Sequence, residues 1–233
     1  MIPLSIIILT HNSEKYLHEV LTSCTFAEEV ILVDSGSNDQ TLGIAQTFSN
    51  VTVKQQSWLG FGLQKQYGVD LASHDWVFVL DSDEMITEAL HNEIITILQN
   101  PTCQGYLVPR INYFFGKPIK RMGLYPDATL RLFHRQHGHF NDNAVHEKVI
   151  LRGKKGETIA PMLHYAYENI EQFIAKQNRY SSLGSKRNYW KALVNPYWTF
   201  CKLYFFKRGF LEGWNGWIIA KLYAQYTFWK YIK

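Results

Sequence analysis

The sequence has few cysteines and no long uncharged stretch. Its three cysteines, Cys24, Cys103 and Cys201, are odd in number and include no CxxC pair, so neither a disulfide framework nor a cysteine-ligated zinc site is expected. The uncharged run over residues 2–13 is shorter than the about 20 residues that a membrane-spanning helix needs. It also follows Met1 without a basic segment, which disfavours a secretory signal peptide. We therefore expect a reducing compartment and a soluble or peripheral protein.

Three motifs of common enzyme classes are also missing. No GxGxxG follows the first apolar run, which disfavours a dinucleotide-binding Rossmann site. The absence of GxxxxGK[ST] disfavours a P-loop kinase or ATPase, and no GxSxG nucleophile elbow occurs. In contrast, 46% of the 233 residues are hydrophobic, which is enough for a packed domain with an appendage.

Charge and aromatic residues are distributed unevenly along the chain. The net charge is +4, but residues 186–233 alone contain nine Lys and Arg residues, one acidic residue and 16 aromatic residues. The preceding part carries a net charge of −4. We therefore expect an α/β domain over residues 1–185 and a helical tail over residues 186–233.

Apolar side chains recur at helical spacing within residues 210–232 of the tail. Trp and Tyr favour the membrane–water interface, and Lys and Arg are attracted to anionic lipids. The pattern predicts a helix that lies on an anionic membrane surface. The alternative is that the aromatic residues pack on the domain or form the seam of a homo-oligomer. The recurring residues are Phe210, Leu211, Trp214, Trp217, Ile218, Phe228, Trp229 and Ile232.

Short apolar runs alternate with segments of helical spacing over the first part of the chain. This alternation predicts an α/β domain with a mostly parallel sheet, followed by a mixed or antiparallel part after residue 105. In such sheets ligands bind at the carboxyl ends of the strands, so the polar clusters at residues 10–12, 34–37 and 81–83 should converge. We expect strands over residues 4–9, 30–33, 51–53, 76–80, 106–109, 130–134 and 149–151, and helices over residues 14–23, 41–48, 62–72, 88–98 and 168–188.

The sequence Asp81-Ser82-Asp83-Glu84 follows the fourth of these strands. In an extended segment residues i and i+2 point the same way, so Asp81 and Asp83 can face one site. Two carboxylates at a strand end suit Mg²⁺ or Mn²⁺, and such an ion can neutralise a departing diphosphate. The alternative is an acidic turn that caps the next helix.

The segments SIIILTHNSEKYL, VILVDSGSNDQT and HDWVFVLDSDE resemble, in this order and spacing, inverting glycosyltransferase family 2 with the A-type fold. The segments PRINYFFGKPIKRMGLYPDATLRLFHR and NAVHEKV, with the tail, resemble a narrower group. That group is the bacterial lipopolysaccharide inner-core β-glucosyltransferases, which add glucose to a heptose. The resemblance implies a metal-dependent inverting hexosyltransferase whose nucleotide-sugar-binding domain covers residues 1–185.

The resemblance also implies residues that bind the donor. Thr10, Asn12 and Asp34 would line the uridine pocket, and Lys65 would lie near the nucleotide. Ser35 stands where many family members have a second acidic residue. The alternatives are that Thr10 and Asn12 cap the first helix and that Lys65 is a solvated helix residue.

For the metal, the resemblance implies that Asp81 contacts the ribose or the ion and that Asp83 holds the ion. His164 would complete the metal site, as a late His does in some transferases of this fold. The alternative is that His164 is a core residue with satisfied hydrogen bonds.

An inverting transfer needs a carboxylate that takes the proton of the acceptor hydroxyl, opposite the leaving diphosphate. Glu147 matches the base-bearing segment of the narrower group, and Asp142 is the second candidate. The alternative is a surface Glu147 paired with Lys148 or Arg152.

Several basic residues could bind an anionic acceptor such as a phosphorylated heptose. They are Arg110, Arg131 and Arg135, with Asp127 nearby in the sequence, although a structural Arg–Asp pair is an equal alternative.

The expected partners are a UDP-sugar donor, with UDP-glucose implied by the resemblance, a lipid-linked saccharide acceptor and an anionic membrane, but no nucleic acid. The expected location is the cytoplasmic face of the plasma membrane. A transferase with another donor or a polyprenyl or protein acceptor is the first rival. A non-catalytic nucleotide-sugar binder or membrane scaffold is the second.

Overall fold

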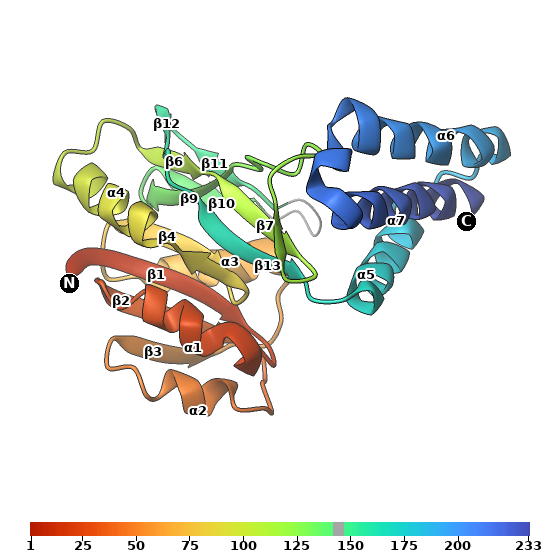
Figure 1. The fold of residues 1–233 in the computed structure, drawn as a ribbon. Coiled ribbons are helices and arrows are strands. Elements are labelled where there is room, and N and C mark those ends of the chain that lie inside the picture. Colours follow the sequence, from red (N-terminus) through yellow and green to blue (C-terminus); the bar gives the residue numbers. More distant parts are fainter. Residues whose placement is uncertain (142–146) are drawn as a thin grey trace. The chain divides into compact units, whose positions relative to one another are not determined.

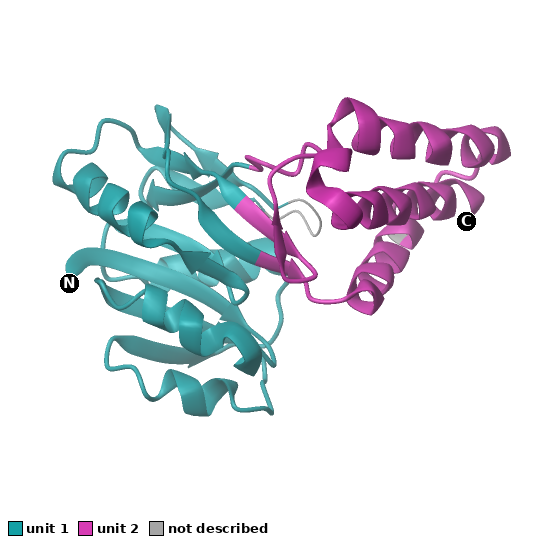
Figure 2. Cartoon of the chain, in the orientation of Figure 1, with its two compact units in different colours: residues 1–110, 128–164 teal, residues 111–127, 165–233 magenta. Residues whose placement is uncertain are grey.

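The computed structural model describes residues 1–141 and 147–233 (Figure 1). The chain forms two compact units (Figure 2). Unit 1 comprises residues 1–110 and 128–164, and unit 2 comprises residues 111–127 and 165–233. These units are not the two segments expected from composition, because residues 111–127 and 165–185 belong to the same unit as the aromatic tail.

Unit 1 is built around a seven-stranded sheet (Figure 1). In order across the sheet, the strands are β12 (Lys155–Glu157), β6 (Gly105–Val108), β9 (Thr129–His134), β4 (Trp76–Asp81), β1 (Ile2–Thr10), β2 (Ala27–Asp34) and β3 (Val51–Gln55). The strands β4, β1, β2 and β3 are parallel to one another, whereas β9 runs antiparallel to β4 and β6. The predicted mostly parallel sheet with a later mixed part is confirmed.

The central strands are apolar on both faces of the sheet. In β1, Ile6 and Ile8 belong to one buried cluster, whereas Ile7 and Leu9 belong to another. Side chains of a strand alternate between the two faces, so the two clusters lie on opposite sides of the sheet. A strand buried on both faces is a continuous apolar run, which is why this sheet could be predicted from the sequence.

Helices cover both faces (Figure 1). The helices α1 (Glu14–Ser23), α2 (Thr41–Ala45) and α4 (Glu88–Gln99) contribute Leu17, Ala45 and Ile94 to the cluster that contains Ile6 and Ile8. The helix α3 (Phe61–Leu71) packs on the other face, where a Cβ atom on Gly68 would lie 2.4 Å from Cγ2 of Ile7. Only glycine lets α3 approach the sheet this closely.

Smaller strands follow the sheet. In unit 1, β10 (Gly138–Phe140) and β11 (Val149–Leu151) form an antiparallel pair, and β5 (Glu84–Ile86) pairs with the start of β13 (Met162–Tyr167). In unit 2, β7 (Arg110–Phe114) forms an antiparallel hairpin with β8 (Lys117–Ile119). The chain passes between the units within β7 and β13.

Unit 2 is mainly helical, as expected for the tail. Its helices are α5 (Ile170–Leu183), α6 (Tyr189–Cys201) and α7 (Gly213–Ile232), with a π-helical turn η1 (Lys202–Phe206) and a 3₁₀ turn η2 (Gly209–Glu212) between α6 and α7. Their core includes Phe114 of the hairpin, Phe173 of α5 and Ile219 of α7. Across residues 1–141 and 147–233, no helix is long and apolar enough to cross a membrane.

Candidate active site

The polar residues that follow the central strands lie at one edge of the sheet. Thr10 is the partner of Asp34 in the register of β1 and β2, and Leu9 is the partner of Asp81 in the register of β1 and β4. The carboxyl ends of three adjacent parallel strands therefore bring Thr10, Asp34 and Asp81 together. Ligands bind at such an edge in parallel α/β sheets.

Asp34 organises the turns at this edge. Its side chain is buried and accepts hydrogen bonds from Thr10 Oγ1 (3.0 Å), Ser37 Oγ (2.5 Å) and the N–H groups of Gly36 (3.0 Å) and Ser37 (2.9 Å). Burial opposes the charge, but the hydrogen bonds from Ser37 and Thr10 lower the pKa of Asp34 below its ordinary value. Asp34 therefore fixes the loop after β2 as an ionised carboxylate.

Asn12 connects the same loop to the turn after β1. Its Oδ1 accepts a hydrogen bond from the N–H of Asn38 (2.9 Å), and its own N–H donates to Ser37 Oγ (2.9 Å). Its φ of 50° is in the left-handed region that Asn tolerates better than most residues. Ser13, the residue before α1, makes no side-chain cap of this helix. Asn12 thus joins two loops in the structure, while its contact with uridine stays a prediction.

Asp81 lies between two cations. Its Oδ1 is 3.0 Å from Lys65 Nζ, and its Oδ2 accepts a hydrogen bond from Arg131 Nη2 at 3.2 Å. Desolvation opposes the charge of the carboxyl, but Lys65 and then Arg131 hold the pKa of Asp81 well below its ordinary value. Lys65 is 3% exposed, so it is a buried cation and not a solvated residue on the surface of α3.

Glu84 is a further charged residue of this cluster, and no role for it was predicted from the sequence. Its side chain is fully buried, and it pairs with Arg131 (2.5 Å) and with Arg110 (2.8 Å). Its other oxygen accepts the N–H of Asp81 at 3.0 Å. A buried carboxylate is stable only with hydrogen-bonding or charged partners. Glu84 therefore holds in place both the backbone N–H of Asp81 and the guanidinium of Arg131, which also pairs with Asp81. Its position directly after Asp81-Ser82-Asp83 is the feature of the sequence from which a role at this site could have been predicted.

The predicted metal ligands Asp83 and His164 are neighbours. His164 Nε2 lies 3.5 Å from Asp83 Oδ2, and the Asp83 side chain is 37% exposed. Their oxygen and nitrogen donors fit Mg²⁺ or Mn²⁺, with Mn²⁺ better suited to the imidazole. Asp81 is already paired with Lys65 and Arg131, and within the described parts of the chain no three His, Cys, Asp or Glu side chains form a metal-binding group. The remaining ligands of an ion would therefore have to come from substrate and water.

Glu147, the first candidate base, lies beside the same lysine. Its Oε1 accepts a hydrogen bond from Lys65 Nζ at 3.1 Å, and its side chain is 24% exposed. A Cβ atom on Gly62 of α3 would lie 2.3 Å from the carbonyl oxygen of Asn141 and 3.5 Å from Cβ of Glu147. The glycine thus lets α3 pack against this segment. Asp142, the second candidate, lies outside the described residues.

The structure brings together only two of the four residues predicted to bind the acceptor. Arg110 and Arg131 both contact Glu84. Arg135 donates to the carbonyl of Ala72 at 2.6 Å and follows β9 at the amino end of β4. Because the N–H of Arg135 donates to the carbonyl of Asp75, and Asp81 is six residues further along at about 3.3 Å each, Arg135 lies roughly 20 Å along the strand from Asp81. Asp127 belongs to unit 2, where it accepts a hydrogen bond from Asn112 at 3.0 Å.

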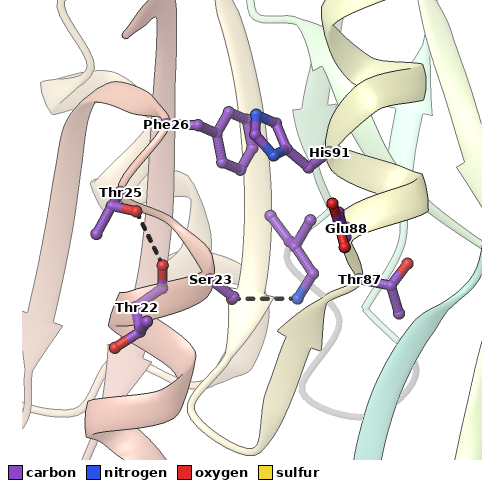
Figure 3. Close-up of a pocket in the computed structure, with 8 residues that line it drawn as sticks. Thr22, Ser23, Thr25, Phe26, Thr87, Glu88 and His91 are labelled. Atoms are coloured by element: carbon purple, nitrogen blue, oxygen red, sulfur yellow. Dashed lines mark hydrogen bonds between the residues drawn. The ribbon is translucent and has the colours of Figure 1, made fainter.

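A separate hollow lies between the end of α1 and the start of α4 (Figure 3). Its wall includes Phe26 and His91, whose rings stack with centroids 4.1 Å apart. The Ser23 hydroxyl accepts the N–H of Ile86 at 3.2 Å. The residues around this hollow include none of the predicted site residues.

Known proteins resemble the chain in sequence and in fold. Lipopolysaccharide core biosynthesis glycosyltransferase LpsC of Rhizobium meliloti (strain 1021) is 28% identical over 242 residues, which cover 97% of this chain and 90% of LpsC. The structure of S. aureus TarS 1–349 in complex with UDP matches with a TM-score of 0.52 and 17% identity, over 78% of this chain and 65% of that chain. Mannosyltransferase PcManGT from Pyrobaculum calidifontis, in complex with GDP-Man and Mn²⁺, matches with a TM-score of 0.54 and 14% identity, over 77% of this chain and 61% of that chain.

The two structures show the glycosyltransferase A-type fold, and this chain spans less than two thirds of each. The sequence profile described as glycosyl transferase family 2 matches residues 5–154, which include β1, β2, β4 and the charged cluster at their ends. The match covers more than half of the chain, so the protein is a glycosyltransferase that belongs to glycosyl transferase family 2.

Proposed function

We propose that the protein transfers a hexose from a nucleotide diphosphate donor, UDP-glucose, to a heptose of the lipopolysaccharide inner core, with inversion at the anomeric carbon. The observation that carries the proposal is the row Asp81–Lys65–Glu147, with distances of 3.0 and 3.1 Å. The Glu147 carboxylate thus shares Lys65 with Asp81 at the carboxyl ends of the strands, which supports its role as the base. The similarity to LpsC over nearly the full length of both proteins supports the acceptor class.

On the donor side, Thr10, Asn12 and Asp34 would form the wall of the uridine pocket. Asp83 and His164 would hold Mg²⁺ or Mn²⁺, and such an ion, when bound, neutralises charge on the leaving diphosphate. The buried ammonium of Lys65 supplies a second positive charge at this edge. Cations fixed where charge develops lower the barrier without reorganisation during the reaction.

On the acceptor side, Glu147 would remove the proton of the attacking hydroxyl. Direct displacement at the anomeric carbon then converts an α-linked donor into a β-linked product. Lys65 donates to Glu147 and so fixes the orientation of the carboxylate before the acceptor binds. Arg110, which is 18% exposed and close to this edge through Glu84, is the candidate for contact with an anionic acceptor.

The proposed acceptor is linked to lipid, so we place the protein on the cytoplasmic face of the plasma membrane, in contact with anionic lipid. The exposed aromatic and basic residues of unit 2 support this location. A transferase that uses another sugar donor, or a polyprenyl or protein acceptor, is the second candidate.

The test is a transfer assay on the full chain. The protein is incubated with Mn²⁺ or Mg²⁺, a panel of UDP-sugars and lipopolysaccharide truncated before the inner-core hexose, and the product is weighed by mass spectrometry. We expect the mass of one hexose to be added from UDP-glucose. Glu147→Gln should abolish the product, whereas Glu157→Gln, an exposed Glu of β12, should leave it unchanged. Addition only from another donor, or only to another acceptor class, would overturn the proposal in favour of the rival.

A further inference from the structure

Unit 2 exposes an extended apolar surface on α6. Six large apolar side chains of this helix are each more than half exposed, and Trp190 (79%) and Tyr197 (77%) are the most exposed. We call this set the α6 face. It consists of Tyr189, Trp190, Leu193, Val194, Tyr197 and Trp198.

The α6 face is one side of an amphipathic helix. Its members recur at intervals of three and four residues, which places them on the same side of an α-helix. The opposite side packs inside unit 2, since Ala192 is 3% exposed and Thr199 Oγ1 lies 3.2 Å from Thr227 Oγ1 of α7. Figure 1 shows α6 lying along α7. The α6 face is therefore the side that unit 2 leaves uncovered.

The apolar surface continues through the turns after α6. The rings of Trp198 and Phe206 are in contact, with centroids 5.6 Å apart. Phe205, Phe206 and Trp214 are 55%, 71% and 70% exposed. At about 150–250 Å² for an aromatic side chain, the four aromatic residues of the α6 face alone expose on the order of 500 Å². This area is at the upper end for a monomeric soluble protein, and the turns enlarge it further.

The charges along α6 and η1 are all positive, and Glu212 at the end of η2 is 14% exposed. Residues 186–211 contain six Lys and Arg residues and no Asp or Glu. All six are exposed: Lys186, Arg187, Lys191, Lys202, Lys207 and Arg208. A basic border around Trp and Tyr side chains is the composition of helices that lie in the interface of anionic bilayers.

We propose that the α6 face and the adjoining η1 and η2 turns dock on an anionic lipid bilayer, with α6 lying in the headgroup region. The proposal deepens the proposed function, because it names the surface that would bring the site to a lipid-linked acceptor. A second copy of the chain fits less well. A twofold pairing of this face would bring two sets of six cations together, and residues 186–233 offer a single carboxylate side chain, the largely buried Glu212, to neutralise them.

This surface overlaps only the start of the stripe expected in the tail sequence, where Phe210 and Leu211 of η2 are 47% and 52% exposed. In α7, the helix core buries Gly216, Ile219, Ala220 and Ala224. Trp214 at its start is exposed, whereas the later stripe residues are only partly exposed: Trp217, Ile218, Phe228, Trp229 and Ile232. The docking surface therefore lies on α6 and the turns, and α7 supports α6 from within unit 2.

Vesicle binding of the full-length protein tests the surface. We expect it to sediment with vesicles of phosphatidylcholine and phosphatidylglycerol, but weakly with phosphatidylcholine alone. High salt should release much of it. The triple variant Trp190→Ser, Val194→Ser, Tyr197→Ser should bind at least about tenfold more weakly, because its aromatic anchors are lost. Ile150→Ser, Ile159→Ser, which changes two exposed apolar residues of unit 1, is the matched control and should bind like wild type.

The charges are tested in the same assay. Replacing Lys186 and Arg187 by Gln should weaken binding roughly 30-fold, at about 1 kcal/mol per cation. Lys154→Gln, Lys155→Gln, two exposed residues of unit 1, should leave binding unchanged. Circular dichroism checks that each variant is folded. If the triple variant binds like wild type, or if its main effect is to dissociate a dimer in sedimentation equilibrium, the docking proposal is overturned.

An activity readout separates this proposal from the proposed function. The triple variant should transfer sugar to a delipidated, water-soluble core acceptor at the wild-type rate, but transfer poorly to the same acceptor embedded in vesicles. If wild type transfers to neither acceptor, the proposed function fails while the vesicle result stands. If the variant transfers equally well to both acceptors, α6 does not bring the enzyme to lipid.

Discussion

Replacing Glu84 by Gln should destabilise unit 1 by about 3 kcal/mol, because it removes one charge from a buried ion pair. Glu84 is fully buried between Arg131 and Arg110 and accepts the N–H of Asp81. Breaking a buried pair costs about 3–5 kcal/mol. The lower end applies here, since Arg131 keeps Asp81 as a partner at 3.2 Å and Gln still offers an oxygen to the Asp81 N–H.

Thermal unfolding followed by far-ultraviolet circular dichroism measures the loss. At roughly 2–4 °C per kcal/mol for a protein of this size, Tm should fall by roughly 6–12 °C. Glu19→Gln, on the exposed side of α1, is the matched control and should shift Tm by less than about 2 °C. UDP binding should also weaken, because the backbone of Asp81 loses a charged acceptor. An unchanged Tm for Glu84→Gln would refute the view that this ion pair holds Asp81 in place.

Three further predictions concern the carboxylates of the site. Asp83→Ala, or EDTA added to wild type, should slow sugar transfer at least about 10²-fold, and full turnover in EDTA would exclude a metal role. Glu147→Gln should slow transfer about 10²–10⁴-fold without changing UDP affinity. An inactive Asp142→Asn beside an active Glu147→Gln would move the base to Asp142. Because Lys65 and Arg131 lower the pKa of Asp81, its ionisation stabilises the fold above about pH 4, and this contribution is lost in more acidic solution. The difference in urea midpoint between wild type and Asp81→Asn should therefore shrink below about pH 4, and a constant difference would contradict the assignment.

The first half of the fold could be predicted because its signals are local. The runs around Ile6, Ile31 and Phe78 are apolar on both sides, and each is followed by polar residues. Parallel strands then place Thr10, Asp34 and Asp81 at one edge without any knowledge of contacts. Asp83 and His164 are far apart along the chain but are neighbours in the structure, while their role as metal ligands stays a prediction.

Other features depend on pairings that periodicity does not encode. The strand β9 lies antiparallel between β4 and β6. Because of this pairing, Arg131 contacts the Asp81 side chain, whereas Arg135 lies at the opposite end of β4. Two arginines four residues apart thus differ completely in their contacts. Likewise, helical spacing shows that a face is apolar but not whether another helix covers it. The sequence therefore favoured a stripe over residues 210–232, whereas the six exposed apolar positions that form one continuous face belong to α6.

The charges gathered in unit 1 explain why the metal test is decisive for the mechanism. The cluster combines four carboxylates with three cations: Asp81, Asp83, Glu84 and Glu147 with Lys65, Arg110 and Arg131. With His164 neutral, these side chains sum to a net charge of −1, which repels a diphosphate. A divalent cation held by Asp83 and His164 would change that sum to +1 and attract it. We therefore expect sugar transfer to depend on an added divalent cation, because the carboxylates that position Lys65 and Arg131 leave this edge with a net negative charge.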